Sequence, residues 1–192
     1  NIFALNSLGV LMRDKKKYQN SENHFKEAIL YKPDYFDAYF NLGILYSKKK
    51  QFKKSEISYI KSITLKPNNC NALNNLANVY RQQGKFKKAI TYIKRAIAIK
   101  PDNIIFWNNL YFPLKLIKAQ EKFKKNSLLD NIKKELNFTN NVYASLLQYK
   151  LYMGSTKSGF FFKKAVSAVK KSNVQISNPY YFKNSLKNIK IN

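Results

Sequence analysis

CNALNNLANVYRQQGKFKKAITYIKRAIAIKPDN, residues 70–103, is the best-formed unit of the chain. Its apolar residues recur at the spacing of two amphipathic helices. Gly84 marks a short turn between the helices, and Pro101 closes the unit because proline cannot continue a helix. The stretch therefore predicts a helical hairpin.

The same unit occurs twice upstream. Pro33, Pro67 and Pro101 are each one period apart, since 67 − 33 = 34 and 101 − 67 = 34. Seven further positions recur with the same step, and each carries related residues in successive units. They are Leu8, Leu42, Leu76 and Leu110; Gly9, Gly43 and Ala77; Met12, Tyr46 and Tyr80; Tyr18, Phe52 and Phe86; Ser21, Ser55 and Ala89; Phe25, Tyr59 and Ile93; Ala28, Ser62 and Ala96. One hairpin cannot bury its apolar face alone, whereas stacked neighbours can. The repetition predicts an array.

The small residues are expected to set the distance between the two helices of a hairpin. Gly43 with Ser55, or Ala77 with Ala89, allows a close approach, and large residues such as Tyr59 fill the remaining space. The order Leu-Gly, aromatic, Ala, aromatic, Ala and Pro over one period resembles the tetratricopeptide repeat (TPR) family.

The resemblance implies an all-α fold, a right-handed superhelical array of helix–turn–helix repeats. Three full repeats fit at about 2–35, 36–69 and 70–103. The fourth unit begins in register with Trp107 and Leu110 and then departs from the pattern. Tyr111 replaces the small residue, and Pro113 falls where it is expected to kink or break the helix.

We therefore interpret 104–118 as a terminal helix and 1–118 as the array. Residues 119–172 are expected to form a divergent helical extension, and 173–192 a linker or truncated segment. The chain begins without methionine, at what resembles the start of a helix. We expect it to be part of a longer polypeptide.

The charge is extreme. Thirty-six basic residues face ten acidic ones, a formal net charge of +26, and only three of the basic residues are arginines. Many lysines fall at or near the turns inside the repeats: Lys15, Lys16, Lys17, Lys48, Lys49, Lys50, Lys53, Lys54, Lys85, Lys87 and Lys88. This lysine edge has two interpretations, a solvated edge produced by composition or a surface for nucleic acid or another polyanion.

The sequence contains no recognisable catalytic constellation. Cys70 and His24 are the only residues of their kinds, which excludes an internal disulfide and a Cys/His metal cluster. Residues 154–159 have a passing similarity to the phosphate loop of sulfotransferases, but a helix is expected before them and Phe160 stands where a threonine is needed, so we interpret them as a helix cap and turn. We expect no enzyme activity in this chain, no cofactor and no metal. No apolar run reaches the roughly 20 residues of a membrane span, and we expect a cytoplasmic protein.

The family resemblance also implies a binding surface. In tetratricopeptide arrays the first helices of successive repeats line a concave groove for an extended peptide or a partner helix. The corresponding residues here are Asn6, Phe40, Asn41, Ile44, Lys48, Asn74, Asn75, Asn78, Arg81, Asn108, Asn109 and Phe112.

Asn41, Asn75 and Asn109 occupy one equivalent position of the groove. They resemble the asparagine ladder that holds a peptide backbone in protein O-GlcNAc transferases. The alternative is that these amides bond neighbouring repeats to one another.

Three functions remain open. The first is a protein-interaction scaffold that binds a peptide or helix in the groove. The second is a substrate-presenting region of a larger transferase, because residues 107–114 resemble the N-terminal part of bacterial sulfotransferase-like proteins. The third is polyanion binding by the lysine edge. The sequence does not identify the partner.

Overall fold

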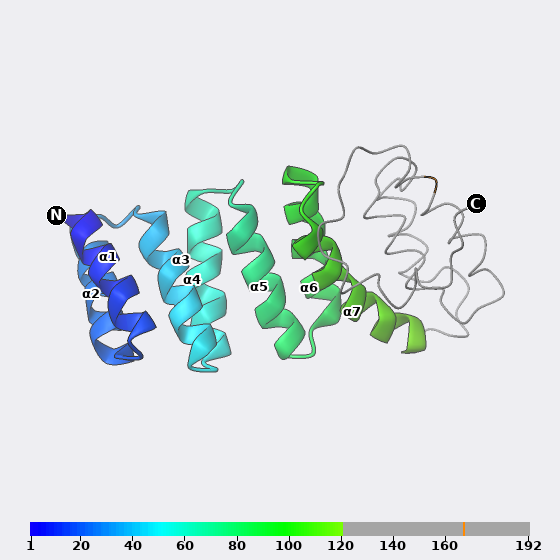
Figure 1. The fold of residues 1–192 in the computed structure, drawn as a ribbon, viewed down its shortest axis with the longest axis horizontal. Helices are drawn as coiled ribbons and strands as arrows, with labels where there is room; N and C mark the ends of the chain where they lie inside the picture. The colour runs from blue at the N-terminus through cyan, green and yellow to red at the C-terminus, as the bar shows by residue number, and fades with distance from the viewer. Residues whose placement is uncertain (121–166, 168–192) are drawn as a thin grey trace, which may run out of the picture.

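The computed structural model describes residues 1–120 and 167, and it confirms the all-α array. The described residues form seven helices and no strand. The helices are α1 (Ile2–Asp14), α2 (Tyr18–Tyr31), α3 (Phe36–Lys48), α4 (Phe52–Leu65), α5 (Cys70–Gln82), α6 (Phe86–Ile99) and α7 (Ile104–Gln120). Three hairpins stand side by side, and α7 follows them (Figure 1). Apart from the end of α7 and residue 167, the predicted extension and the linker lie outside the described residues.

Helix α7 continues through Pro113 to Gln120, so the expected break is absent. The Pro113 side chain is fully buried. Its neighbours Leu110 and Leu114 belong to the hydrophobic core that contains the residues of α5 and α6. This burial offsets the hydrogen bond that proline removes from the helix.

The two helices of each of the first two hairpins meet at a glycine. A Cβ atom at Gly9 would lie 2.5 Å from the Phe25 ring, and one at Gly43 would lie 2.6 Å from the Tyr59 ring. The Ser55 hydroxyl donates a hydrogen bond of 2.7 Å to the carbonyl oxygen of Gly43, as the equivalent serine does in the first hairpin. The expected close approach is therefore confirmed.

The third hairpin satisfies the same spacing with different side chains. Ala77, Ala89 and Ile93 occupy the small, small and large positions, and all three are fully buried. The extra methyl group on the first helix is thus accompanied by a smaller side chain on the second. Total volume is conserved across the contact, which is what a close-packed core requires.

Neighbouring hairpins are joined by a tyrosine–glutamate hydrogen bond, which is buried at the first junction and partly buried at the second. The Tyr46 hydroxyl of α3 donates to Glu22 of α2 at 2.9 Å, and Tyr80 of α5 donates to Glu56 of α4 at the same distance. One period further on, the two positions are occupied by Ile90 and Leu114, both of which are buried. The polar pair is therefore replaced as a unit, because neither member can be buried alone without cost.

The turns inside the hairpins share one backbone geometry. Lys16 and Lys50 have φ angles of 60° and 57°, and Gly84, in the same register, has 73°. Residues other than glycine are less stable in this left-handed region because their Cβ atom approaches the backbone too closely. The turn conformation is therefore imposed by packing of the hairpins and does not depend on a glycine.

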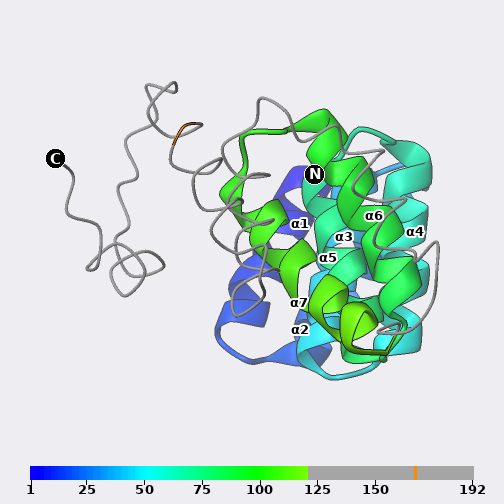
Figure 2. The same cartoon turned by 90° about the vertical axis from the view of Figure 1, so that its right-hand side faces the viewer.

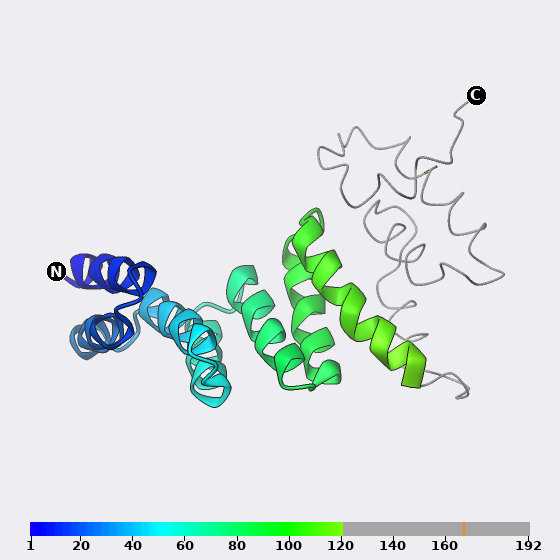
Figure 3. The same ribbon diagram turned by 60° about the horizontal axis from the view of Figure 1, so that its bottom comes forward.

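The first helices form the inner row of the array. Helix α1 contacts α3, α3 contacts α5, and α5 contacts α7, whereas α2, α4 and α6 make no direct contact with one another. Looking along the array, α4 and α6 lie on the opposite side from α5 and α7 (Figure 2). The three hairpins and α7 then succeed one another as a curved series (Figure 3). The array curves toward its first helices.

The outward side of α1 is apolar and exposed. Leu8 is 41% exposed, whereas its equivalents Leu42 and Leu76 are 5% and 0% exposed. Leu11 is 45% exposed, and its equivalent Leu45 is fully buried. The positions that α3 and α5 bury against the preceding hairpin are thus uncovered on the first hairpin of the described chain.

We predict that Gly43→Ala destabilises the protein by about 1–3 kcal/mol, because the added methyl group overlaps the Tyr59 ring. Tyr59→Ile alone should also destabilise it, by roughly 1–3 kcal/mol, through the volume it removes. The double variant reproduces the Ala77–Ile93 pair and should cost at least about 1 kcal/mol less than the sum of the single changes. Urea unfolding of all four proteins measures this coupling, and simple additivity would contradict it.

A second prediction concerns acid. Burial raises the pKa of Glu22, but hydrogen bonds from Lys26 and Tyr46 and the charges of Lys26 and Lys49 outweigh it and leave the pKa below its usual 4.5. A carboxyl group with a lowered folded-state pKa contributes stability above its unfolded-state pKa, and that contribution is lost as the pH falls through the folded value. Glu22→Gln should therefore reduce the free energy of unfolding more at about pH 7 than at about pH 3.5.

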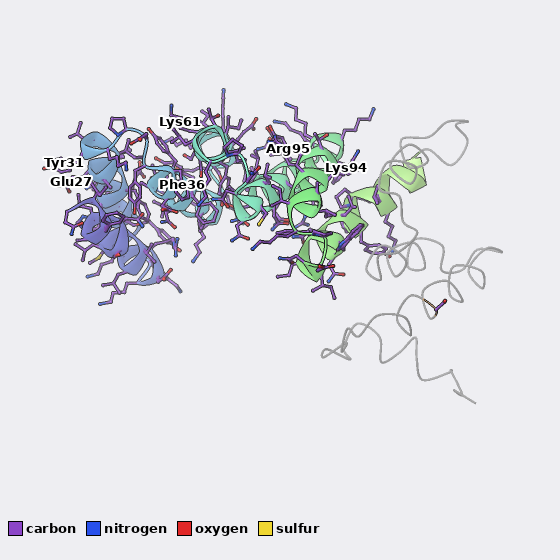
Figure 4. All side chains as sticks on the ribbon, turned by 90° about the horizontal axis from the view of Figure 1, so that it is seen from above. Glu27, Tyr31, Phe36, Lys61, Lys94 and Arg95 are labelled. Atoms are coloured by element: carbon purple, nitrogen blue, oxygen red, sulfur yellow. The ribbon has the colours of Figure 1, made fainter. Side chains whose placement is uncertain are left out.

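The matched control is Glu27→Gln, an exposed glutamate on the same helix (Figure 4). Chemical unfolding at both pH values measures the two variants against the parent. We expect the cost of Glu22→Gln to be about 1–2 kcal/mol at the higher pH. An equal cost at both pH values would contradict the argument.

Candidate functional site

The predicted groove residues all lie on the inner row of helices. Asn6 is on α1; Phe40, Asn41, Ile44 and Lys48 are on α3; Asn74, Asn75, Asn78 and Arg81 are on α5; Asn108, Asn109 and Phe112 are on α7. We call the surface formed by these twelve residues the first-helix face. Whether it binds a ligand is a separate question, which depends on the surroundings of each side chain.

Two pairs of asparagines link consecutive first helices. The Asn41 side-chain amide donates a hydrogen bond of 2.9 Å to Asn6, and that of Asn109 donates one of 2.8 Å to Asn74. Asn41 is 9% exposed and Asn74 is 7% exposed. The amides at these positions therefore form hydrogen bonds between repeats, as expected if they hold neighbouring repeats together.

The middle link is different, because Phe40 occupies the position held by Asn6 and Asn74 in the other repeats. The Phe40 ring packs on the Tyr59 ring, with centroids 6.0 Å apart. Burial raises the pKa of the Tyr59 hydroxyl, and a hydrogen bond with Asn75 acts in the opposite direction. Asn75 is half-buried, so it combines a structural bond with access to solvent.

Arg13 belongs to the same surface, although the sequence prediction omitted it. Its guanidinium donates a hydrogen bond of 3.2 Å to the Asn41 side-chain oxygen and forms an ion pair with Asp14 at 3.1 Å. The Arg13 side chain is only 11% exposed. Its register would have revealed it, because Arg81 occupies the equivalent position two periods later.

The C-terminal part of the face is more open. The Arg81 guanidinium lies over the Phe112 ring, 5.7 Å from its centroid, and Phe112 is 46% exposed. The side-chain oxygen of Asn78 is buried and has no hydrogen-bond partner. The polar side chains of α5 and α7 on this face are therefore less fully hydrogen-bonded within the array than those of α1 and α3.

Several members of the lysine edge are engaged within the protein. Lys49 lies 3.4 Å from Glu22, Lys85 lies 3.9 Å from Glu56, and Lys48 lies 4.0 Å from Asp14. Lys54 and Lys88 lie over the rings of Tyr46 and Tyr80 at 5.6 and 5.4 Å. The three ion pairs neutralise part of the edge and favour the interpretation of a solvated edge over a row of cations held free for a polyanion.

The described residues contain no group of three or more His, Cys, Asp or Glu side chains arranged to hold a metal ion. Within the same residues, no helix is both long enough and apolar enough to cross a membrane. Cys70 is buried.

Comparison with known families decides the identity of the repeats. The tetratricopeptide repeat matches residues 70–103 and, independently, residues 36–69. A related description, TPR repeat, matches residues 9–50. The chain belongs to the tetratricopeptide repeat family over these residues.

Solved structures of low sequence identity share the TPR fold. MamA superposes with a TM-score of 0.60 at 19% identity and covers 89% of this chain and 80% of its own. The Arabidopsis OM64 TPR domain gives 0.56 at 16% identity, covering 58% of this chain and 93% of that domain. No curated protein matches the sequence.

A mutant of the Thermobaculum terrenum O-GlcNAc transferase gives a TM-score of 0.55 at 24% identity. The match covers 59% of this chain but 22% of the transferase. The likeness concerns the fold of the repeats. The TPR matches end at residue 103 and give no support to the sulfotransferase-like resemblance over 107–114.

The TPR array is thus a helical scaffold of the kind that mediates protein interactions. Some polar side chains of its first-helix face are hydrogen-bonded between repeats. The signal for the interhelical amide bonds was present in the sequence as an offset of 35 residues, from Asn6 to Asn41 and from Asn74 to Asn109. The prediction compared residues one period apart, which are equivalent in the fold but do not touch.

We predict that Asn41→Ala lowers the free energy of unfolding by about 1–3 kcal/mol, because it removes the partner of the Asn6 side-chain oxygen and one of the two partners of the largely buried Arg13. Asn108→Ala is the matched control on α7, since Asn108 is half-buried and its side chain makes no hydrogen bond with a described residue. Its cost should stay within about 0.5 kcal/mol. Urea unfolding measures both, and equal costs would contradict a structural role for Asn41.

Proposed function

We propose that the protein is an interaction scaffold whose first-helix face binds an extended peptide segment of a partner protein. The observation that carries the proposal is the continuous row α1–α3–α5–α7, which presents carboxamide side chains from consecutive helices on one side of the array. A carboxamide can both donate and accept, so it can pair with the N–H and C=O groups of a peptide backbone.

The half-buried amides are the ones suited to this role. Asn41 and Asn74 are buried and bonded within the array. Asn75, Asn78 and Asn108 are half-buried, and they lie on neighbouring helices α5 and α7. An extended strand could be held there by backbone hydrogen bonds, with specificity supplied by the side chains between them.

The test is selection of peptides from a random display library against the full chain, followed by affinity measurement for the selected sequences. In the variant Asn78→Ala/Asn108→Ala the affinity should fall about tenfold, corresponding to roughly 1.4 kcal/mol. Thermal unfolding of the variant should stay close to that of the parent.

Asn23→Ala is the control, because Asn23 is an exposed asparagine on α2, away from the inner row. It should leave peptide affinity unchanged. If the library yields no peptide, or if the selected peptides bind the inner-row variant and the parent equally, the proposal is wrong.

A further inference from the structure

The two halves of the first-helix face differ in charge. In α1 and α3, Asp14 and Asp37 are present, and Asp14 lies 3.1 Å from Arg13 and 4.0 Å from Lys48. Helices α5 and α7 contain no acidic residue. The cations of the C-terminal half are therefore not neutralised by carboxylates on their own helices.

The cations of this half lie against aromatic rings. Arg81 of α5 lies over Phe112 of α7 at 5.7 Å, and Lys115 lies over Tyr111 at 5.9 Å. The contact with a ring orients a cation without cancelling its charge, so each still attracts an anion. Arg81 in particular presents a planar fork of donors suited to a carboxylate.

An exposed aromatic surface lies beside these cations. Phe112 is 46% exposed, and its ring packs edge-on against Phe86, with centroids 6.5 Å apart. Equivalent positions in the earlier repeats carry Val10, Ile44 and Asn78, none of which is as exposed. The Phe112 ring can therefore contact an apolar side chain of a ligand, while Arg81 beside it can contact a charged group of the same ligand.

We infer that Arg81, Phe112 and Lys115, the α5–α7 surface, bind a peptide segment in which an acidic residue adjoins a large apolar residue. The inference rests on the proposed function and narrows it to one partner chemistry. The carboxylate pairs with Arg81 and Lys115, and the apolar side chain covers Phe112.

The probe is a fluorescein-labelled peptide of about twelve residues containing Glu-Phe pairs separated by Gly and Ser, titrated with the full chain at about 150 mM salt. Versions with Gln-Phe and Glu-Ala pairs test the two elements separately. Each should bind at least about fivefold more weakly than the Glu-Phe peptide. Equal binding of all three would overturn the inference while leaving peptide binding by the inner row intact.

Arg81→Gln and Phe112→Ala should each weaken Glu-Phe binding at least about fivefold. The matched control is Arg95→Gln on α6: Arg95 lies 5.7 Å from the Tyr92 ring, the same separation as for Arg81 and Phe112, but on the row of second helices (Figure 4). This control should bind the peptide like the parent. Thermal unfolding verifies that each variant is folded.

The remaining outcomes are equally decisive. An equal loss in Arg95→Gln would show general attraction to the positive protein and overturn the inference. Displacement of the peptide by an oligothymidylate at the same concentration as by unlabelled Glu-Phe peptide would overturn it in favour of a polyanion site. If library peptides bind and depend on Asn78 and Asn108, yet none carries an acidic–apolar pair, this inference fails and the proposed function stands.

Discussion

The contact between the small residue of each first helix and the large residue of its second helix governs how the hairpins are built. At Gly9 and Gly43 the aromatic ring of the second helix occupies the space where a side chain would begin. A serine hydroxyl then reaches the carbonyl oxygen of the same glycine, so the polar group on the opposing helix is also satisfied. This fixes the separation of the two helices, and with it the direction in which each second helix presents Glu22 or Glu56 to the next hairpin.

The junctions between hairpins depend on that separation. A tyrosine hydroxyl reaches a glutamate only if the hairpin holds the glutamate at the right depth, and the two bonds have the same length of 2.9 Å. At the last junction Ile90 and Leu114 make the contact without polar groups. The change coincides with Tyr111, where the small residue of the first helix is lost. Once the hairpin geometry is abandoned, an apolar contact tolerates small displacements better than a buried hydrogen bond does.

Periodicity predicted the helices and the small-to-large pairing because both depend on residues that repeat within one hairpin. It predicted the surroundings of the inner-row amides less well. A period identifies equivalent residues, whereas the hydrogen bonds join residues one step out of register, such as Asn6 and Asn41. Pro113 shows a second limit. Its local tendency to end a helix was known from the sequence, but the burial that overcomes it depends on the packing of α7 against α6. Position alone could not show which amides retain capacity for a ligand.

Two equivalent arginines show how one position of the repeat can have different surroundings. Arg13 and Arg81 share one register, and each is followed 28 residues later by an asparagine, Asn41 or Asn109. Arg13 donates to its asparagine and pairs with the adjacent Asp14. Arg81 is followed by Gln82 in place of the aspartate, and it lies over Phe112. Arginine at this position therefore forms a hydrogen bond between repeats in the first repeat and lies over an exposed ring in the third. The backbone of the hairpin is the same in both, so the difference comes from the neighbours. A few substitutions at fixed register are sufficient to turn an arginine bonded between repeats into an arginine that lies over an exposed ring.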